Sequence, residues 1–206
     1  IVMCEKLYPE LIPNLSSVKS PQQVAGAIIK TYFAQKVKRQ PRDIFSCSVM
    51  PCTAKKDEQA REAMRRPDGS WDVDCVLTTR ETAEVFKAFK IRWEDLPEEA
   101  PDDPLGESTG AAALFGVTGG VMEAALRTAI ELRTKRRLDQ IKFNDVRGLN
   151  GTKESTISMV VPDDQKGGSA TKTIEIKVVC VNGGKNLREL CDKLVRKEVF
   201  YHFVEL

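Results

Sequence analysis

Apolar residues recur at helical spacing behind a helix-start signal near the beginning of the chain. Ser20 is followed by Pro21, Gln22 and Gln23, which gives a capping serine, a proline at the first helical position and a glutamine three residues after the cap. The apolar residues that then repeat at steps of one, three and four are Val24, Ala25, Ile28, Ile29, Tyr32 and Phe33. This pattern predicts a helix from Pro21 to about Val37.

Further helices are predicted at four places. Residues 53–65 are rich in Ala, Lys, Glu and Arg, which favour helix. Capping residues ahead of apolar stripes predict helices that begin near Thr78, Thr118 and Asn186. Between the helices lie short apolar or β-branched runs that predict strands at Ile44–Met50, Val73–Leu77, Thr156–Val161, Thr171–Val181 and Phe200–Val204.

Strands that alternate with helices indicate an α/β fold with a partly parallel sheet. The two strands on either side of the polar segment 162–170 predict a hairpin. Residues 93–110 are acidic, contain proline and show no periodicity, so they predict a long loop. We expect two α/β lobes, with mixed or parallel sheets flanked by helices, and a division between them near 101–110.

Composition narrows the classes of function. The chain has 206 residues, 41% of them hydrophobic, and can bury a substantial core. A net charge of +2, from 32 basic and 30 acidic residues, does not indicate binding to nucleic acid or membrane, and no apolar run approaches the roughly 20 residues of a spanning helix. Six cysteines without framework spacing indicate a reducing compartment.

The most informative segment is Met50-Pro51-Cys52, at the turn between a predicted strand and a predicted helix. The positive end of a helix favours the thiolate, which is the form that binds metal or attacks an electrophile. Lys55 adds a cationic donor one turn later. The alternatives are a cysteine that acts as a small buried hydrophobe and a lysine that pairs with Asp57 or Glu58.

Among the other cysteines, Cys47, Cys75 and Cys191 lie in apolar patterns and are predicted to be core residues, and Cys180 lies in a predicted strand.

Several segments, in this order, resemble the catalytic domain of the [FeFe]-hydrogenases. They are residues 16–23 (S-S-V-K-S-P-Q-Q), 50–58 (M-P-C-T-A-K-K-D-E), 74–81 (D-C-V-L-T-T-R-E), 102–110 (D-D-P-L-G-E-S-T-G) and 115–127 (F-G-V-T-G-G-V-M-E-A-A-L-R). The resemblance implies a cubane [4Fe-4S] cluster bridged to a two-iron subcluster, which together form the H-cluster, in an active-site cleft between the two lobes. It also implies reversible proton reduction to H₂.

The resemblance assigns roles to particular residues. It makes Cys52 a cubane ligand and Lys55 the donor to a bound cyanide, with Ser16 on a proton path. The residues that it places around the two-iron part are Met50, Pro51, Ser20, Pro21, Gln22, Phe115, Gly116 and Thr118. The alternatives are ordinary ones: a helix cap at Ser20, close helix packing at the glycines, and an exposed serine at Ser16.

The resemblance also implies what lies outside this sequence. Of four cubane cysteines, only the one matching Cys52 is present, and residue 1 is Ile, so we expect the chain to be an internal fragment of a longer protein. Because a cubane takes about four thiolates, we expect this chain alone to hold none and to be inactive. Expected partners are a ferredoxin-type electron carrier and H-cluster maturation proteins, in the cytoplasm or, in an anaerobic eukaryote, the hydrogenosome.

Two functions of other classes remain open. One is a hydrogenase-like protein of iron–sulfur assembly, which shares the M-P-C segment and cubane ligands but has no two-iron site. The other is a thiol enzyme that uses Cys52, which needs a neighbouring base. The single histidine, His202, is far from Cys52 in the sequence and supports the thiol enzyme poorly.

Overall fold

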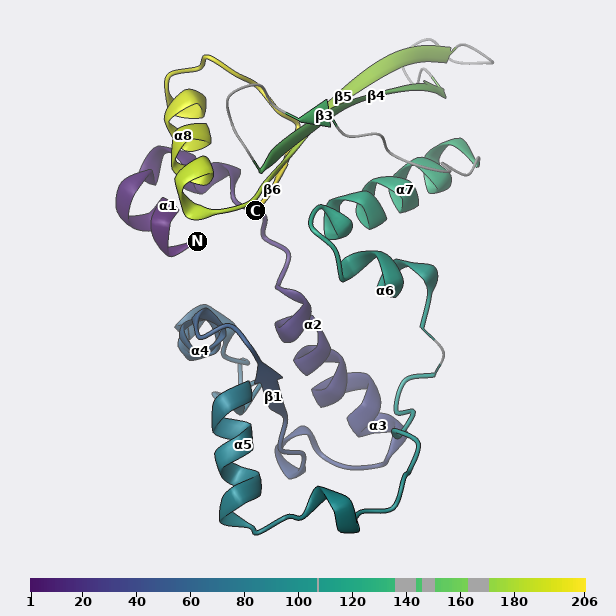
Figure 1. Ribbon diagram of the computed structural model, residues 1–206. Coiled ribbons are helices and arrows are strands. Elements are labelled where there is room, and N and C mark those ends of the chain that lie inside the picture. The colour runs from purple at the N-terminus through teal and green to yellow at the C-terminus, as the bar shows by residue number, and fades with distance from the viewer. Residues whose placement is uncertain (107, 136–143, 146–150, 163–170) are drawn as a thin grey trace. The chain divides into compact units, whose positions relative to one another are not determined.

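A computed structural model describes residues 1–106, 108–135, 144–145, 151–162 and 171–206 (Figure 1). Contacts divide the chain into two compact units, residues 16–107 and residues 1–15 with 108–206. The chain therefore passes from one unit to the other near residue 15 as well as near residue 107. Each unit combines helices with a small sheet, so the chain is a mixed α/β protein. None of the described helices is long and apolar enough to cross a membrane.

In the unit formed by residues 16–107, the helix predicted from Pro21 is present. It runs as α2 (Pro21–Ile28), a π-helical turn η2 (Ile29–Phe33) and α3 (Ala34–Lys36). Ser20 caps it, since the Gln23 backbone N–H donates to Ser20 Oγ at 3.4 Å. The π-helical turn is the one part of this segment that the apolar spacing did not predict.

The buried face of this helix is polar, contrary to what its apolar stripe suggests. Val24, Ile28 and Tyr32 are exposed, while the buried residues recur on the opposite face at Gln22, Gln23, Gly26, Lys30 and Ala34. The reason lies in the loops beneath the helix. Their backbone and carboxylate groups need donors, and a buried polar group without a partner destabilises the fold.

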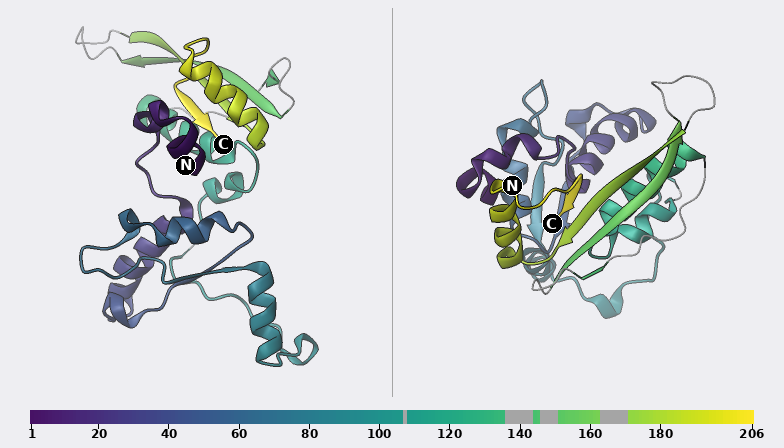
Figure 2. Two further views of the ribbon diagram at one scale, coloured as in Figure 1. Left: turned by 90° about the vertical axis from the view of Figure 1, so that its left-hand side faces the viewer. Right: turned by 90° about the horizontal axis from the view of Figure 1, so that it is seen from above.

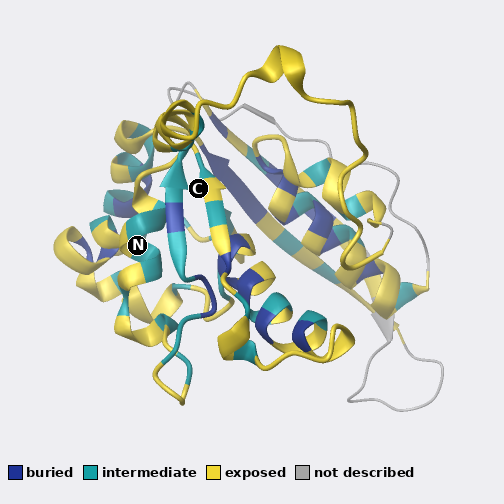
Figure 3. Ribbon diagram, turned by 90° about the horizontal axis from the view of Figure 1, so that it is seen from below, coloured by how far each residue is buried: buried dark blue, intermediate teal, exposed yellow. Residues whose placement is uncertain are grey.

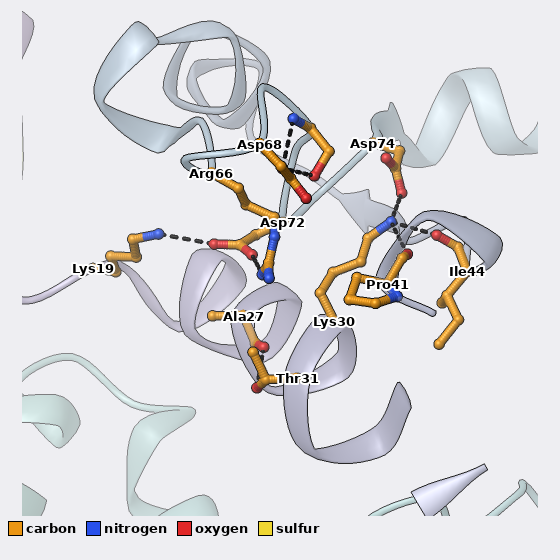
Figure 4. Close-up of polar contacts among 11 residues, drawn as sticks. Lys19, Ala27, Lys30, Thr31, Pro41, Ile44, Arg66, Asp68, Asp72 and Asp74 are labelled. Atoms are coloured by element: carbon orange, nitrogen blue, oxygen red, sulfur yellow. Dashed lines mark hydrogen bonds and ion pairs between the residues drawn. The ribbon is translucent and has the colours of Figure 1, made fainter. Parts of the chain in front are cut away.

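Figure 4 shows how Lys30 meets this need. Its Nζ donates to Asp74 Oδ2 at 2.6 Å, to the Pro41 carbonyl at 3.4 Å and to the Ile44 carbonyl. The same Asp74 oxygen accepts from the Ser46 backbone N–H at 2.7 Å. Because side chains take up the Ile44 carbonyl and the Ser46 backbone N–H, the strand predicted at Ile44–Met50 begins only at Cys47.

The sheet of this unit has two parallel strands, β1 (Cys47–Met50) and β2 (Cys75–Thr78). Helix α4 (Ala54–Ala60) and the 3₁₀ turn η4 (Glu62–Met64) lie between them, and α5 (Thr79–Ala88) follows β2. The capping box predicted at Thr78 and Glu81 is present at the start of α5. The unit also contains the 3₁₀ turns η3 (Pro41–Asp43) and η5 (Trp93–Asp95). The loop predicted at 93–110 is confirmed in part: residues 93–95 form η5 and Gly110 begins a helix, whereas the described residues 96–106, 108 and 109 form no helix or strand.

The other unit is built on a four-stranded sheet in the order β3-β4-β5-β6. The strands are β3 (Asn144–Asp145), β4 (Thr152–Pro162), β5 (Thr171–Val181) and β6 (Phe203–Glu205). The predicted hairpin is confirmed, because β4 and β5 pair antiparallel along their whole length. Its connecting residues 163–170 lie outside the described residues. Strand β6 pairs parallel to β5.

Helices α7 (Gly120–Thr134) and α8 (Gly184–Val195) cover the two faces of this sheet (Figure 2). Alternate residues of β5 point to opposite faces of the sheet and pack against different helices. Val178 and Cys180 pack with Met122, Leu126 and Ile130 of α7, whereas Val179 and Val181 pack with Leu190 of α8. Figure 3 shows the buried positions in dark blue on the sheet and on neighbouring helix faces. The unit also contains α1 (Val2–Leu7), η1 (Pro9–Asn14) and α6 (Gly110–Phe115).

The cysteines divide between core and surface. Cys191 is buried, as predicted, and so are Cys4 and Cys180. The prediction of a core position is wrong for Cys47, which is exposed, and Cys75 is only half-buried. Strand β1 pairs only with β2 in the described part of the chain, so alternate β1 residues stay exposed.

Candidate functional site

Cys52 lies on an open turn between β1 and α4. The strand ends at Met50 and the helix begins at Ala54, so the predicted strand-to-helix turn is confirmed. The Lys55 backbone N–H donates to the Cys52 carbonyl at 3.2 Å, which closes the turn. The Cys52 thiol is free and the residue is exposed. A buried hydrophobic role, the ordinary alternative for this cysteine, is therefore excluded in this structure.

Gln22 connects this turn to the start of α2. Its side chain is buried, its Oε1 accepts from Ser48 Oγ at 2.9 Å, and its Nε2 donates to the Lys55 carbonyl at 3.3 Å. One amide thus joins α2, β1 and α4. The sequence resemblance named Gln22 and Lys55 separately, and the fold of this unit brings them into direct contact.

The Lys55 ammonium is paired within its own helix. Its Nζ lies 2.6 Å from Glu58 Oε2, and both side chains are partly buried. This is the pairing that the sequence offered as the ordinary alternative. An ammonium has three N–H groups, so Lys55 can donate to an anionic ligand and to Glu58 at the same time.

Lys56 fastens the same helix to β2 and α5. Its Nζ donates to the Val76 carbonyl at 2.8 Å and lies 2.8 Å from Glu81 Oε2. Hydrogen bonds from Lys56 and from Thr78 lower the pKa of Glu81 from 4.5 to about 2. The two neighbouring lysines thus have different contacts. Lys56 fastens α4 to β2 and α5, whereas Lys55 pairs with Glu58 in its own helix.

The remaining predicted residues of this unit lie near the same elements. Met50 is half-buried at the end of β1, and Pro51 is exposed beside Cys52. Ser20 caps α2 and Pro21 is its exposed first residue. Ser16 is exposed, and its Oγ accepts from the Val18 backbone N–H at 3.2 Å, which is a local turn contact.

Phe115, Gly116 and Thr118 belong to the other unit, so their proximity to Cys52 stays a prediction. Phe115 and Gly116 lie at the end of a helix, ahead of the one predicted near Thr118. Phe115 is the last residue of α6 and Gly116 follows it as the C-cap, because a short helix forms before the one that the sequence predicted.

Helix α7 begins after Thr118, with Gly119 as its N-cap at φ +83°. The start of this helix holds a protein carboxylate. Glu205 Oε2 on β6 accepts from the Met122 backbone N–H at 2.6 Å. This contact satisfies one of the free amides of the helix terminus.

Sequence reasoning missed the polar residues that support the turn. Ser48 orients the Gln22 amide, and the ion pair of Lys30 with Asp74 ties η2 to the residue before β2. The available signal was the polar residues inside apolar patterns: a serine in an apolar strand, and adjacent glutamines with a lysine on one helix. Gln23 is buried as well, and its amide nitrogen and oxygen have no partner within the described structure.

The ligand set of this chain does not fit a complete iron–sulfur cluster. Among the described residues, no three or more His, Cys, Asp or Glu side chains come together as a metal site would require. Cys52 is a single exposed thiol, whereas a cubane takes about four thiolates. Cys52 could supply one of those ligands.

Comparison with known proteins identifies the family to which the chain is similar. All of residues 1–206 match the family described as "Iron only hydrogenase large subunit, C-terminal domain". The chain is 43% identical to the periplasmic [Fe] hydrogenase large subunit of Nitratidesulfovibrio vulgaris, over 98% of this chain and 45% of that protein. A variant of the [FeFe]-hydrogenase HydA1 from Chlamydomonas reinhardtii superposes with a TM-score of 0.80 at 38% identity, over 100% of this chain and 56% of that one.

Similarity to a second kind of protein is lower. The cytosolic iron–sulfur assembly component 3 of Pongo abelii is 31% identical, over 100% of this chain and 42% of that protein. The chain thus spans about half the length, or less, of these relatives. Its full-length match to the family model and its similarity to the hydrogenases in both sequence and fold establish that the chain belongs to the iron-only hydrogenase large-subunit family.

Proposed function

We propose that this chain is part of an [FeFe]-hydrogenase catalytic domain whose complete protein interconverts protons and H₂. The observation that carries the proposal is the 43% identity to a hydrogenase large subunit along 98% of the chain, against 31% to an iron–sulfur assembly protein. In the complete protein, a [4Fe-4S] cubane and a two-iron subcluster would supply the electron transfer and the hydrogen chemistry.

Cys52 would be the contribution of this chain to cluster binding. Its exposed position on a turn closed by a backbone hydrogen bond is suited to a metal ligand, because the thiol can reach a cluster that other parts of the protein also bind. The remaining thiolates would come from segments outside this sequence. Met50 and Pro51 would pack beside the cluster, and Ser20 and Pro21 would form part of its wall.

Lys55 would donate to an anionic iron ligand. A hydrogen bond to a charged group contributes about 1.5–3 kcal/mol, and the three N–H groups of the ammonium allow this bond beside the Glu58 pair. Gln22 would hold the Lys55 backbone in place, since its hydrogen bond goes to the carbonyl and does not engage the ammonium. Phe115, Gly116 and Thr118 would contribute to the surroundings of the two-iron part, and Ser16 would lie on the proton path.

We further infer that electrons arrive from a ferredoxin-type carrier and that maturation proteins deliver the two-iron part. A cytoplasmic or hydrogenosomal location fits these partners. The alternative is a hydrogenase-like assembly protein with a cubane and no hydrogen chemistry, supported by the 31% identity to such a protein.

One experiment separates the two functions. The complete protein that contains this chain is produced together with hydrogenase maturation proteins, and H₂ evolution is measured with a reduced viologen as electron donor. The hydrogenase proposal requires H₂ evolution, together with infrared bands from iron-bound CO and CN⁻. A protein that retains a cubane by electron paramagnetic resonance, yet gives neither these bands nor H₂, would instead be an assembly protein.

A further inference from the structure

Two thiols outside the cluster site lie side by side on the small parallel sheet. Cys47 is the first residue of β1 and Cys75 is the first residue of β2, and the strand register pairs these residues with each other. Registered residues of neighbouring strands project from the same face of a sheet and are separated by one strand spacing, about 4.8 Å. This spacing lies within the range of about 4.4–6.8 Å between the Cα atoms of disulfide-bonded cysteines.

The two thiols differ in their access to solvent. Cys47 is exposed and Cys75 is half-buried, while Cys4, Cys180 and Cys191 are buried. A soluble oxidant therefore reaches Cys47 directly and Cys75 lies behind it. The only other exposed cysteine is Cys52, which is at the far end of β1 from Cys47.

The two sulfur atoms also interact. Partial removal of its sulfur from water, the nearby Cys75 sulfur and a hydrogen bond with Cys75 together raise the pKa of Cys47 above its usual 9.0. The Cys47 side chain is thus mainly a thiol at neutral pH, and its reaction with an oxidant is slow there because the thiolate is the nucleophile.

We propose that Cys47 and Cys75 form a redox-active dithiol that a peroxide converts into a disulfide within one chain. The Cys47 sulfur attacks the peroxide oxygen, which gives a sulfenic acid and releases water in the case of hydrogen peroxide. The Cys75 sulfur then attacks the oxidised sulfur, the S–O bond breaks, and a second water leaves. Two thiols and one hydrogen peroxide give one disulfide and two waters, and the two sulfurs lose the two electrons that the peroxide gains.

Such a disulfide would be labile. It would join neighbouring strands near the surface, and exposed or strained disulfides are the ones that thiols reduce most readily. The dithiol would therefore respond reversibly to oxidant. One of its members, Cys47, lies five residues before Cys52 in the sequence. This function does not depend on the proposed hydrogenase activity, because it uses neither Cys52 nor any iron ligand.

Mass spectrometry of the 206-residue chain tests the proposal. Cys52→Ser is the working background, since trypsin leaves Cys47 and Cys52 together in the peptide 43–55. The protein is treated with hydrogen peroxide, remaining thiols are alkylated, and the digest is examined. We expect peptide 43–55 to be linked to the peptide that carries Cys75, with a mass lower by two hydrogens, and dithiothreitol to release the link. The thiol count of the unfolded protein should fall from five to three.

Two matched variants complete the test. Cys75→Ser in the same background should lose the linked peptide and accumulate Cys47 as a sulfenic acid that dimedone traps, which shows that the exposed thiol still reacts. Cys47→Ser should lose the linked peptide and leave Cys75 largely reduced. The proposal is overturned if the Cys52→Ser protein shows dimedone-trapped Cys47 and no link, or if Cys47 links instead to a cysteine other than Cys75.

Discussion

The Gln22 side chain reaches from α2 to the backbone of Lys55, where its Nε2 donates to the carbonyl oxygen across 3.3 Å. Together with the 2.9 Å hydrogen bond from Ser48 Oγ to its Oε1, this buried amide joins three elements around the Cys52 turn. The next residue, Gln23, is also buried, and its amide has no partner in the described structure. Adjacent glutamines thus make opposite contributions to stability.

We expect the same substitution to have opposite effects at these two positions. Gln22→Leu leaves the Ser48 hydroxyl and the Lys55 carbonyl without their partner and should lower the free energy of unfolding by about 1–3 kcal/mol. Gln23→Leu removes a buried amide that has no partner and should be neutral or stabilising. Urea unfolding followed by circular dichroism measures both. A loss of stability in Gln23→Leu as large as that in Gln22→Leu would contradict the assignment.

Gly26 should not tolerate a methyl group. A Cβ at this position would lie 2.6 Å from Val73 Cγ2 and 2.7 Å from the Asp72 carbonyl oxygen, and a backbone oxygen cannot move aside cheaply. Gly26→Ala should therefore destabilise the protein by about 1–3 kcal/mol, although alanine favours helix more than glycine does. Gly184→Ala is the control, because its Cβ would meet nothing within 4 Å and its φ is ordinary. That variant should be slightly more stable, by about 0.4–1 kcal/mol.

Glu81 should make the stability of the folded protein depend on pH. Hydrogen bonds from Lys56 and Thr78 lower its pKa from 4.5 to about 2 in the folded protein. A depressed carboxyl pKa contributes stability above about pH 4.5, and this contribution is lost as the pH falls toward 2. Glu81→Gln should flatten the decline of the melting temperature between about pH 5 and pH 2. Glu84→Gln is the control, because Glu84 pairs with Lys87 on the exposed face of the same helix. Equal pH profiles for the two variants would refute this role for Glu81.

Cys52 and Lys55 should separate by role in the complete protein. Cys52→Ser removes a cubane ligand and should abolish both the cubane signal and H₂ evolution. Lys55→Ala should keep the cubane signal and weaken the infrared bands of the two-iron part, with a roughly tenfold or greater loss of activity. Lys55→Arg should restore part of those bands, since it keeps the charge. Wild-type activity in Lys55→Ala would sink the role proposed for this lysine.

The chain by itself should not retain a cluster. Its described residues bring no three metal-ligating side chains together, and a single thiolate binds iron weakly. After anaerobic treatment with ferrous iron and sulfide followed by desalting, we expect far less than one cluster per chain by iron analysis and by absorbance near 400 nm. Retention of four irons and four sulfides per chain would show that other residues complete the site.

The sequence by itself determined the local structure and the family. The Ser20 and Thr78 caps, the α7 stripe and the β4–β5 hairpin follow from hydrogen bonds and spacings between residues close in the chain, so they could be predicted without a fold. The M-P-C turn could also be predicted, because it joins adjacent elements.

The tertiary structure alone decided which faces are buried and which distant groups meet. The buried face of the helix formed by α2 and η2 is polar because Gln22 and Lys30 satisfy backbone groups of other segments, and periodicity carries no information about such partners. Cys47 is exposed because β1 has one neighbour in the described sheet, a property of strand order that an apolar run does not encode. Glu205 meets the start of α7 because β6 pairs with β5, and only long-range pairing of strands creates that contact.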